Sequence, residues 1–374
     1  MQTTTLRVSE PREILALVPH RLGFRPRDSA VAVSLRRPRG EVGLVVRVDL
    51  PHLADLQDGP LLARTLVAHL GRDAARRGLL VLYTDRDPRG EDGPAHRAAR
   101  HLREAAAEPL GDVPVWVVTP DGYLALDCTD DCCPPGGRPL LDLDSTQVGA
   151  TLVLAGSAVA DSRDDIARIR PQSADARRST ARVRRRWEAR LQEAQLTGDD
   201  ALARWRSDSL VAWRAAVALV AEGRPSAGGA PWGRVEAGLA DRRVRDAVLV
   251  ALVPGTGDLP ERCVLEPQTS PGIDAALGAA MAMIIDPRQG VMPPEAASAV
   301  HEAVLEAVVA RGRAGGQAPA LTLLALLAWW RGDGARARVL LDRALDAEPG
   351  YRLAELIDDA LRAAIPPGWV RNVD

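Results

Sequence analysis

Leu79-Leu80-Val81-Leu82-Tyr83 is the stretch that decides the fold of the first half of this chain. It is a nearly continuous apolar run, without the alternation of a strand that meets water on one face, and so predicts a strand covered on both faces. The run from Val113 to Val118 has the same character. Helical patterns at about 60–77 and 94–107 precede these two runs, and each is long enough to return the chain for parallel pairing.

Two further strands and a short helix are expected before this stretch. Val31, Val33 and Leu35 alternate with smaller or polar residues, and residues 44–48 follow after a turn at 38–41, which predicts a hairpin with one buried face. Before the hairpin, Ser9-Glu10-Pro11 has the cap, acid and proline of a helix start. Together these elements predict an α/β domain with a mixed sheet over residues 1–160.

Acidic side chains follow three of the predicted strands, namely Asp49, Asp85 with its neighbour Asp87, and Asp121. Ligands of open sheets bind beyond the carboxyl ends of the strands. Carboxylates from different strands can hold Mg²⁺ for phosphoryl chemistry. Asp is also a common helix cap and turn residue wherever a strand ends. The sequence therefore predicts either a Mg²⁺ site formed by Asp49, Asp85 and Asp121 or three unrelated turns.

Three of the four cysteines lie within six residues, in a loop at 127–140 that a Pro-Gly turn closes. Cys128 with Cys132 or Cys133 has a spacing suited to Zn²⁺. A closed structural zinc site needs four ligands, and the loop supplies no second pair. Elsewhere in the chain the only other thiol is Cys263, and possible nitrogen donors are His52, His69, His96 and His101.

The cysteine loop has other interpretations. Cys128 could form a disulfide with Cys132 or Cys133, whereas the adjacent Cys132 and Cys133 could not easily bond each other. A catalytic thiol would need a positive neighbour, and the nearby acids Asp127, Asp130 and Asp131 are instead expected to raise the thiol pKa values. The cysteines could also simply pack. The sequence leaves packing, metal binding, a disulfide and catalysis open, with catalysis the least favoured.

From residue 161 onward the strand patterns stop, and we predict an α-helical domain over 161–374. Ser162 and Asp165 have the spacing of a capping box. Helices are expected at about 174–195, 234–252, 271–286 and 294–311.

An arginine ridge, formed by Arg178, Arg182, Arg186 and Arg190 at four-residue spacing, lies on the first long helix. Such a ridge could bind a nucleic acid or another polyanion through its phosphates. It could equally be a solvated face. No base-stacking aromatics accompany it, and the chain contains no lysine, so arginine fills every basic surface position.

Residues from about 319 to 364 resemble one tetratricopeptide-like helical hairpin. Gly332-Asp333-Gly334, Ala337, Leu341 and Pro349 match the second half of that repeat, while Leu321, Ala325 and Ala328 depart from the first half. No second copy is found upstream. Because stable repeat arrays usually need three or more units, one hairpin is more often core than receptor.

Composition limits the class of protein. The 374 residues carry a formal net charge of −2, with 46% hydrophobic and 26% charged residues, which excludes a disordered chain, a collagen-like repeat and a small disulfide scaffold. Met1–Arg7 has no secretory pattern, and the most apolar helical stretch, 320–330, is about half the length that a membrane crossing needs. We expect a cytoplasmic protein without a membrane partner.

Three stretches of the chain match those of a known family. Leu15 to Phe24 with Pro26, Asp28 and Ser29, the loop Cys128-x₃-Cys132-Cys133-Pro134-Pro135, and Ser162-Arg163 resemble an uncharacterised actinobacterial family catalogued as domain of unknown function 4192. The resemblance runs from about Leu6 to Trp369. It implies a cytoplasmic actinobacterial protein with a two-part fold, and it implies no reaction and no catalytic residue.

No catalytic signature is found in the sequence. We predict a protein-interaction or regulatory module without catalysis, whose helical half contacts another protein. The first alternative is a metal-dependent enzyme, with Mg²⁺ at the strand-end aspartates or Zn²⁺ at the cysteine loop. The second is polyanion or nucleic-acid binding through the arginine ridge.

Overall fold

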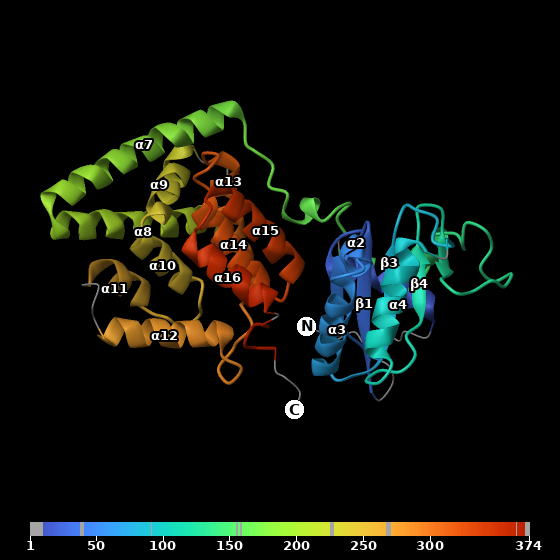
Figure 1. Ribbon diagram of the computed structural model, residues 1–374. Coiled ribbons are helices and arrows are strands. Elements are labelled where there is room, and N and C mark those ends of the chain that lie inside the picture. Colours follow the sequence, from blue (N-terminus) through green and yellow to red (C-terminus); the bar gives the residue numbers. More distant parts are fainter. Residues whose placement is uncertain are drawn as a thin grey trace. The chain divides into compact units, whose positions relative to one another are not determined.

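The computed structural model describes residues 10–37, 41–90, 92–154, 156–157, 159–224, 228–266, 271–363 and 365–370. The chain divides into two compact units, the first ending at Ile166 and the second beginning at Ala167. Each is described separately (Figure 1). The predicted cap at Ser9 and the predicted turn at 38–40 lie outside the described residues.

The first unit is a mixed five-stranded sheet with helices. Its strands have the order β2-β1-β3-β4-β5, in which only β3 and β4 pair in parallel. Its elements are α1 Pro11–Leu22, β1 Ser29–Arg36, β2 Glu41–Asp49, α2 Leu50–Leu53, α3 Gly59–Arg72, β3 Ala75–Tyr83, α4 Pro94–Ala106, β4 Val115–Val118, β5 Tyr123–Ala125, α5 Leu141–Asp144 and α6 Gln147–Leu154. This confirms the predicted mixed sheet.

The central strand β3 is longer than its apolar run. The helical pattern predicted to residue 77 ends at Arg72, because Ala74 takes a left-handed conformation with φ +56° that breaks the helix. The next residues pair with β1, with Arg77 opposite Leu35. The sequence pattern extends the helix too far because Arg76 and Arg77 are exposed and polar, and such residues do not indicate a strand.

Both faces of the central strands are buried, as the run at 79–83 predicts. Ala32, Leu80 and Leu82 belong to a cluster with residues of α2, α3 and α4. Val33 and Val81 point to the opposite face and are fully buried as well. On this second face, residues of α1, α5 and α6 surround a cavity beside Tyr83.

The second unit is helical throughout its described residues. Its helices are α7 Ala174–Thr197, α8 Asp199–Ala221, α9 Gly229–Ala240, α10 Arg242–Ala251, α11 Leu259–Leu265, α12 Pro271–Ile285, α13 Glu295–Arg311, α14 Ala318–Trp330, α15 Gly334–Ala347 and α16 Arg352–Arg362. The single helix predicted at 234–252 is two helices, because the Asp241 side chain accepts hydrogen bonds from the Arg243 and Val244 amides and starts α10. The Ser162 and Asp165 pair begins only a short 3₁₀ turn, Asp164–Ala167.

Helix α14 is the centre of the second unit. Every residue from Ala318 to Trp330 is buried, and α13 and α15 pack against it. The Trp330 indole donates to the Val291 carbonyl at 2.8 Å, so its one polar atom is paired. Helices α14 and α15 pack against each other, and the burial of every α14 residue makes that helix core. The tetratricopeptide-like character of the pair stays a prediction. Among the described helices, none has both the length and the apolar character required to span a membrane.

We predict that Leu324→Ala in α14 lowers the free energy of unfolding by about 2–5 kcal/mol, since Leu324 is fully buried and the truncation leaves a cavity. Leu356→Ala in α16 is the matched control, because Leu356 is 48% exposed. Urea unfolding followed by tryptophan fluorescence measures both, as seven of the eight tryptophans lie in the second unit. Equal losses in the two variants would contradict the central position of α14.

Candidate functional site

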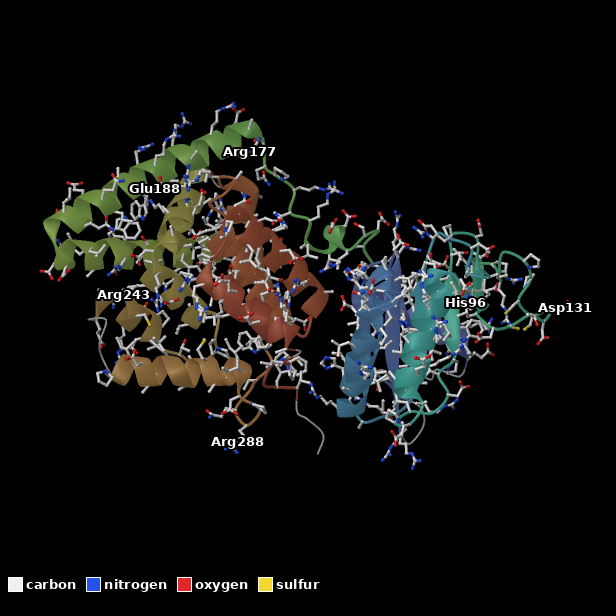
Figure 2. All side chains as sticks on the ribbon, in the orientation of Figure 1. His96, Asp131, Arg177, Glu188, Arg243 and Arg288 are labelled. Carbon is white, nitrogen blue, oxygen red and sulfur yellow. The ribbon has the colours of Figure 1, made fainter. Side chains whose placement is uncertain are left out.

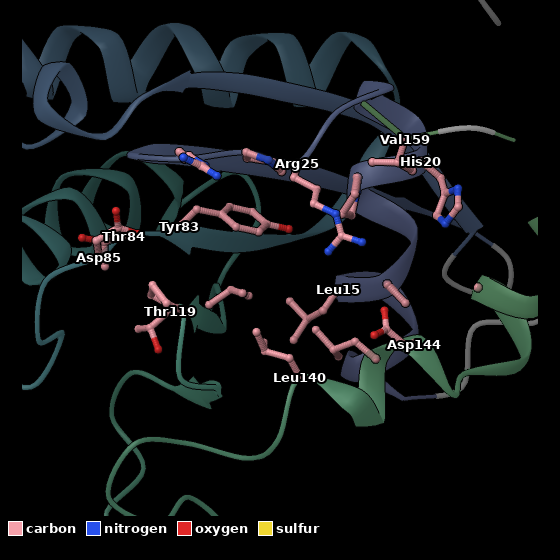
Figure 3. A pocket seen from close by; sticks show the side chains of 18 of the residues that line it. Leu15, His20, Arg25, Tyr83, Thr84, Asp85, Thr119, Leu140, Asp144 and Val159 are labelled. Carbon is pink, nitrogen blue, oxygen red and sulfur yellow. The ribbon is translucent and has the colours of Figure 1, made fainter. Parts of the chain in front are cut away.

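A cavity of about 480 Å³ lies at the carboxyl ends of β3 and β4 in the first unit. Its apolar wall comes from α1, the end of β4 and the α5–α6 region, through Leu15, Val118, Leu140, Leu143 and Val153. Its polar groups come from α1 and the segment after it, from the strand ends, and from Asp144 of α5 (Figure 3). The volume is in the range of small-molecule sites, and the position is the one where open sheets bind ligands.

Tyr83, the last residue of β3, places a buried hydroxyl in this cavity. The residue is 7% exposed, and its hydroxyl has no hydrogen-bond partner within the described chain. Burial raises the pKa of Tyr83 far above its ordinary value, so the group is a neutral phenol and a ready donor. In Figure 3 the hydroxyl points toward the Arg25 guanidinium.

The turn after α1 positions Arg25. Gly23 ends the helix with φ +76°, and Phe24 is buried. The Arg25 amide then donates to the Ala160 carbonyl at 2.9 Å, and the Ala160 amide donates to the Gly23 carbonyl at 2.8 Å. The Leu22-Gly23-Phe24 stretch of the family motif therefore anchors the backbone, so that Arg25 and Arg27 reach the cavity.

The two arginines of the cavity have no ion-pair partner among the described residues, whereas His20 has a polar contact. Arg25 and Arg27 are exposed and make no ion pair with any described residue. His20 lies within 3.0 Å of the Ser157 hydroxyl, and burial together with the Arg25 charge lowers the pKa of His20, which keeps the imidazole neutral at pH 7. Asp85 and Asp144 also line the cavity. Two guanidinium groups are thus free to meet an anionic ligand.

The three strand-end aspartates are not brought together. Asp49 lies at the end of β2 and forms an ion pair with Arg47 at 2.7 Å. Ser29 of β1 lies between Asp49 and Tyr83, so one whole strand separates the end of β2 from that of β3. Asp121 belongs to the turn after β4. In the part of the chain that the structure describes, these carboxylates belong to no cluster of three or more metal-binding side chains.

The cysteine loop does bring its thiols together. The sulfur atoms of Cys128, Cys132 and Cys133 all lie within 4.8 Å of one another, and those of Cys128 and Cys132 are 3.4 Å apart. Cys263 is buried in the second unit, and His101 contacts the Leu53 carbonyl at 2.9 Å.

The pKa shifts of Cys128 and Cys132 come from neighbouring thiols, hydrogen bonds and Arg138, and not from the acidic side chains of the loop. The Cys128 thiol and the Arg138 side chain lower the pKa of Cys132. A backbone hydrogen bond from Asp130 favours the Cys128 thiolate, but the Cys132 and Cys133 thiols outweigh it and raise the pKa of Cys128 to about 11. The expectation was wrong for Cys132, because Arg138 folds back over the loop although it is six residues away in sequence.

The arginine ridge lies on α7 of the second unit, and its four side chains are exposed. Arg178 pairs with Asp175, and the Arg190 guanidinium lies 5.1 Å from the centre of the Trp187 ring. Arg182 and Arg186 have no ion pair among the described residues. Figure 2 shows side chains that end in nitrogen projecting outward from α7 near Arg177.

Sequence reasoning missed Tyr83 and Arg25 as site residues. The available signals were a tyrosine that ends a wholly apolar strand and an arginine inside the Leu-Gly-Phe-x-Pro motif. Neither residue type is diagnostic by itself, and only the fold brings the two positions, 58 residues apart in sequence, to one cavity.

We predict that Tyr83→Phe raises the free energy of opening of β3 by about 1 kcal/mol in the absence of a ligand, because it removes a buried hydroxyl without a partner. Tyr351→Phe is the matched control. Its hydroxyl accepts a hydrogen bond from Arg245 at 3.1 Å, so its loss lowers the stability of its surroundings by a similar amount. Hydrogen exchange of the two regions measures both, and a destabilised Tyr83→Phe variant would contradict the assignment.

Comparison with known proteins identifies the family and no activity. No curated protein and no solved structure matches the chain. One family model matches residues 11–265 and 279–368, a range that includes the cavity, the cysteine loop and α7. The chain therefore belongs to the family described as Domain of unknown function (DUF4192).

Proposed function

We propose that the protein is a regulatory module whose first unit binds a small molecule with an anionic group on an apolar body. The observation that carries this proposal is the unpartnered Tyr83 hydroxyl, buried in a cavity that Arg25 also lines. A buried hydroxyl without a partner costs about 1–3 kcal/mol, and an acceptor on a ligand would remove that cost.

The chemistry of the lining supports the ligand class. The planar guanidinium groups of Arg25 and Arg27 suit a carboxylate or a phosphate, each of which can accept two parallel hydrogen bonds. Leu15, Val118 and Leu140 offer an apolar surface for the rest of the molecule. The neutral His20 imidazole adds a further hydrogen-bonding group at the rim.

The other predicted functions have less support. The Mg²⁺ site stays a prediction, and it has less support because the three strand-end aspartates form no cluster among the described residues. A protein partner for the helical unit stays a prediction. Its hairpin helix α14 is core, and its exposed apolar side chains, such as Leu196, Val211 and Met292, lie on different segments.

We predict that 1-anilinonaphthalene-8-sulfonate, an aromatic anion, binds this cavity with a gain in fluorescence. Arg25→Gln is expected to weaken binding about tenfold or more, since one charge-assisted contact is worth about 1.5–3 kcal/mol. Arg12→Gln is the control, because Arg12 lies outside the cavity and pairs with Glu10. A panel of carboxylates and phosphate esters, screened by displacement of the dye and by thermal shift, then identifies the ligand class.

Two results would reject this proposal. One is equal dye affinity in the wild type and the Arg25→Gln variant, which would indicate non-specific surface binding. The other is a panel in which no anion displaces the dye or raises the melting temperature.

Polyanion binding through α7 is a second candidate, favoured by the exposed and unpaired side chains of Arg182 and Arg186. We predict that affinity for duplex DNA, measured by anisotropy, falls with salt. The double variant Arg182→Ala/Arg186→Ala is expected to reduce the slope of log affinity against log salt by about 2, roughly one per phosphate contact. Arg204→Ala/Arg242→Ala, at exposed positions on α8 and α10, is the control. Affinity that does not change with salt would exclude a phosphate mechanism.

A further inference from the structure

The three clustered thiols have the spacing of metal ligands. A tetrahedral Zn²⁺ site with Zn–S bonds of about 2.3 Å places its sulfur atoms roughly 3.8 Å apart. The Cys128 and Cys132 sulfur atoms are 3.4 Å apart, and all three sulfur atoms lie within 4.8 Å of one another. A disulfide would need about 2.0 Å. The arrangement is therefore near that of three corners of a coordination tetrahedron.

Backbone contacts hold the loop in this shape. The Cys133 amide donates to the Asp130 carbonyl at 2.9 Å. The Arg89 guanidinium donates to the Cys133 carbonyl at 2.7 Å, and the Arg138 side chain donates to the Cys132 carbonyl at 2.5 Å. Gly137, with φ +85°, packs where a side chain would collide with the backbone of Tyr123. The thiols are thus positioned by contacts that do not use their sulfur atoms.

The surrounding charge suits thiolates. Arg138 lies over the Trp116 and Tyr123 rings, at 5.9 and 6.0 Å from their centres, which fixes its guanidinium beside the loop. The Arg138 side chain beside Cys132 offsets part of the negative charge that deprotonation would create. Cys133 is buried and Cys132 is exposed, so the cluster has one side closed by protein and one side open.

We propose that Cys128, Cys132 and Cys133 bind one Zn²⁺ through three thiolates, with an oxygen ligand at the fourth position. The Asp130 carboxylate, which lies 4.0 Å from the Cys128 sulfur, is one candidate for that ligand, and water is the other. The bound ion stabilises the loop at 127–140. This site is separate from the ligand cavity, and the proposal stands whether or not the cavity binds an anion.

The test is metal binding by the full chain, purified under reducing conditions and stripped of metal. Titration with Zn²⁺ against a chromophoric chelator is expected to give one ion per chain. Co²⁺ in its place is expected to give thiolate-to-metal charge-transfer bands and the visible spectrum of a tetrahedral site. Cys132→Ser is expected to weaken Zn²⁺ binding by about 100-fold or more, because even indirect partners of a metal are worth 10–100-fold.

Cys263→Ser is the matched control and is expected to bind Zn²⁺ as the wild type does, since Cys263 lies in the second unit. Because Cys133 is buried and its replacement could disturb folding, the exposed Cys132 carries the test, with circular dichroism as the check. Asp130→Ala separates the two oxygen ligands, since a weakened site identifies the carboxylate and an unchanged site identifies water. Reduced wild-type protein that takes up no Zn²⁺, or Cys132→Ser protein that binds it as tightly, would overturn the proposal.

Discussion

Burial of β3 on both of its faces is the constraint on which the first unit depends. A strand that places Leu80 and Leu82 on one side and Val81 and Tyr83 on the other must be covered by helices twice. One layer, α2 to α4, packs as continuous core. The other layer, to which α1, α5 and α6 belong, leaves a cavity at the strand ends. The position of the cavity therefore follows from how helices cover the second face of the sheet.

Hydrophobic periodicity in the sequence correctly predicts several helices and strands. The apolar run at 79–83 predicts β3, the spacing at 174–195 predicts α7 to within two residues of its end, and the change of pattern near residue 161 lies close to the boundary after Ile166. It does not predict helix boundaries that are set by one residue. Ala74 ends a helix through its own backbone conformation, and Asp241 divides one predicted helix in two through its side chain. Neither event changes the apolar pattern.

The candidate sites also differ in how far the sequence can predict them. The cysteine cluster is local in sequence, so the prediction that its thiols could meet needs only a short loop. The strand-end aspartates depend on strand order, which the sequence does not determine, and β1 in fact separates β2 from β3. The cavity depends on strand order as well, because its two most informative residues come from different elements.

If the cavity binds the proposed anion, the unpaired hydroxyl of Tyr83 would link the abundance of this protein to that ligand. A chain that folds without a partner for that group gives up part of a stability margin that is only about 5–15 kcal/mol for a typical domain. A ligand that binds the folded state alone adds stability in proportion to the logarithm of its concentration. Since unfolded chains are removed by cellular proteases, the amount of folded protein would then follow the supply of the small molecule. Through this single tyrosine, the lifetime of the protein would depend on the concentration of the small molecule.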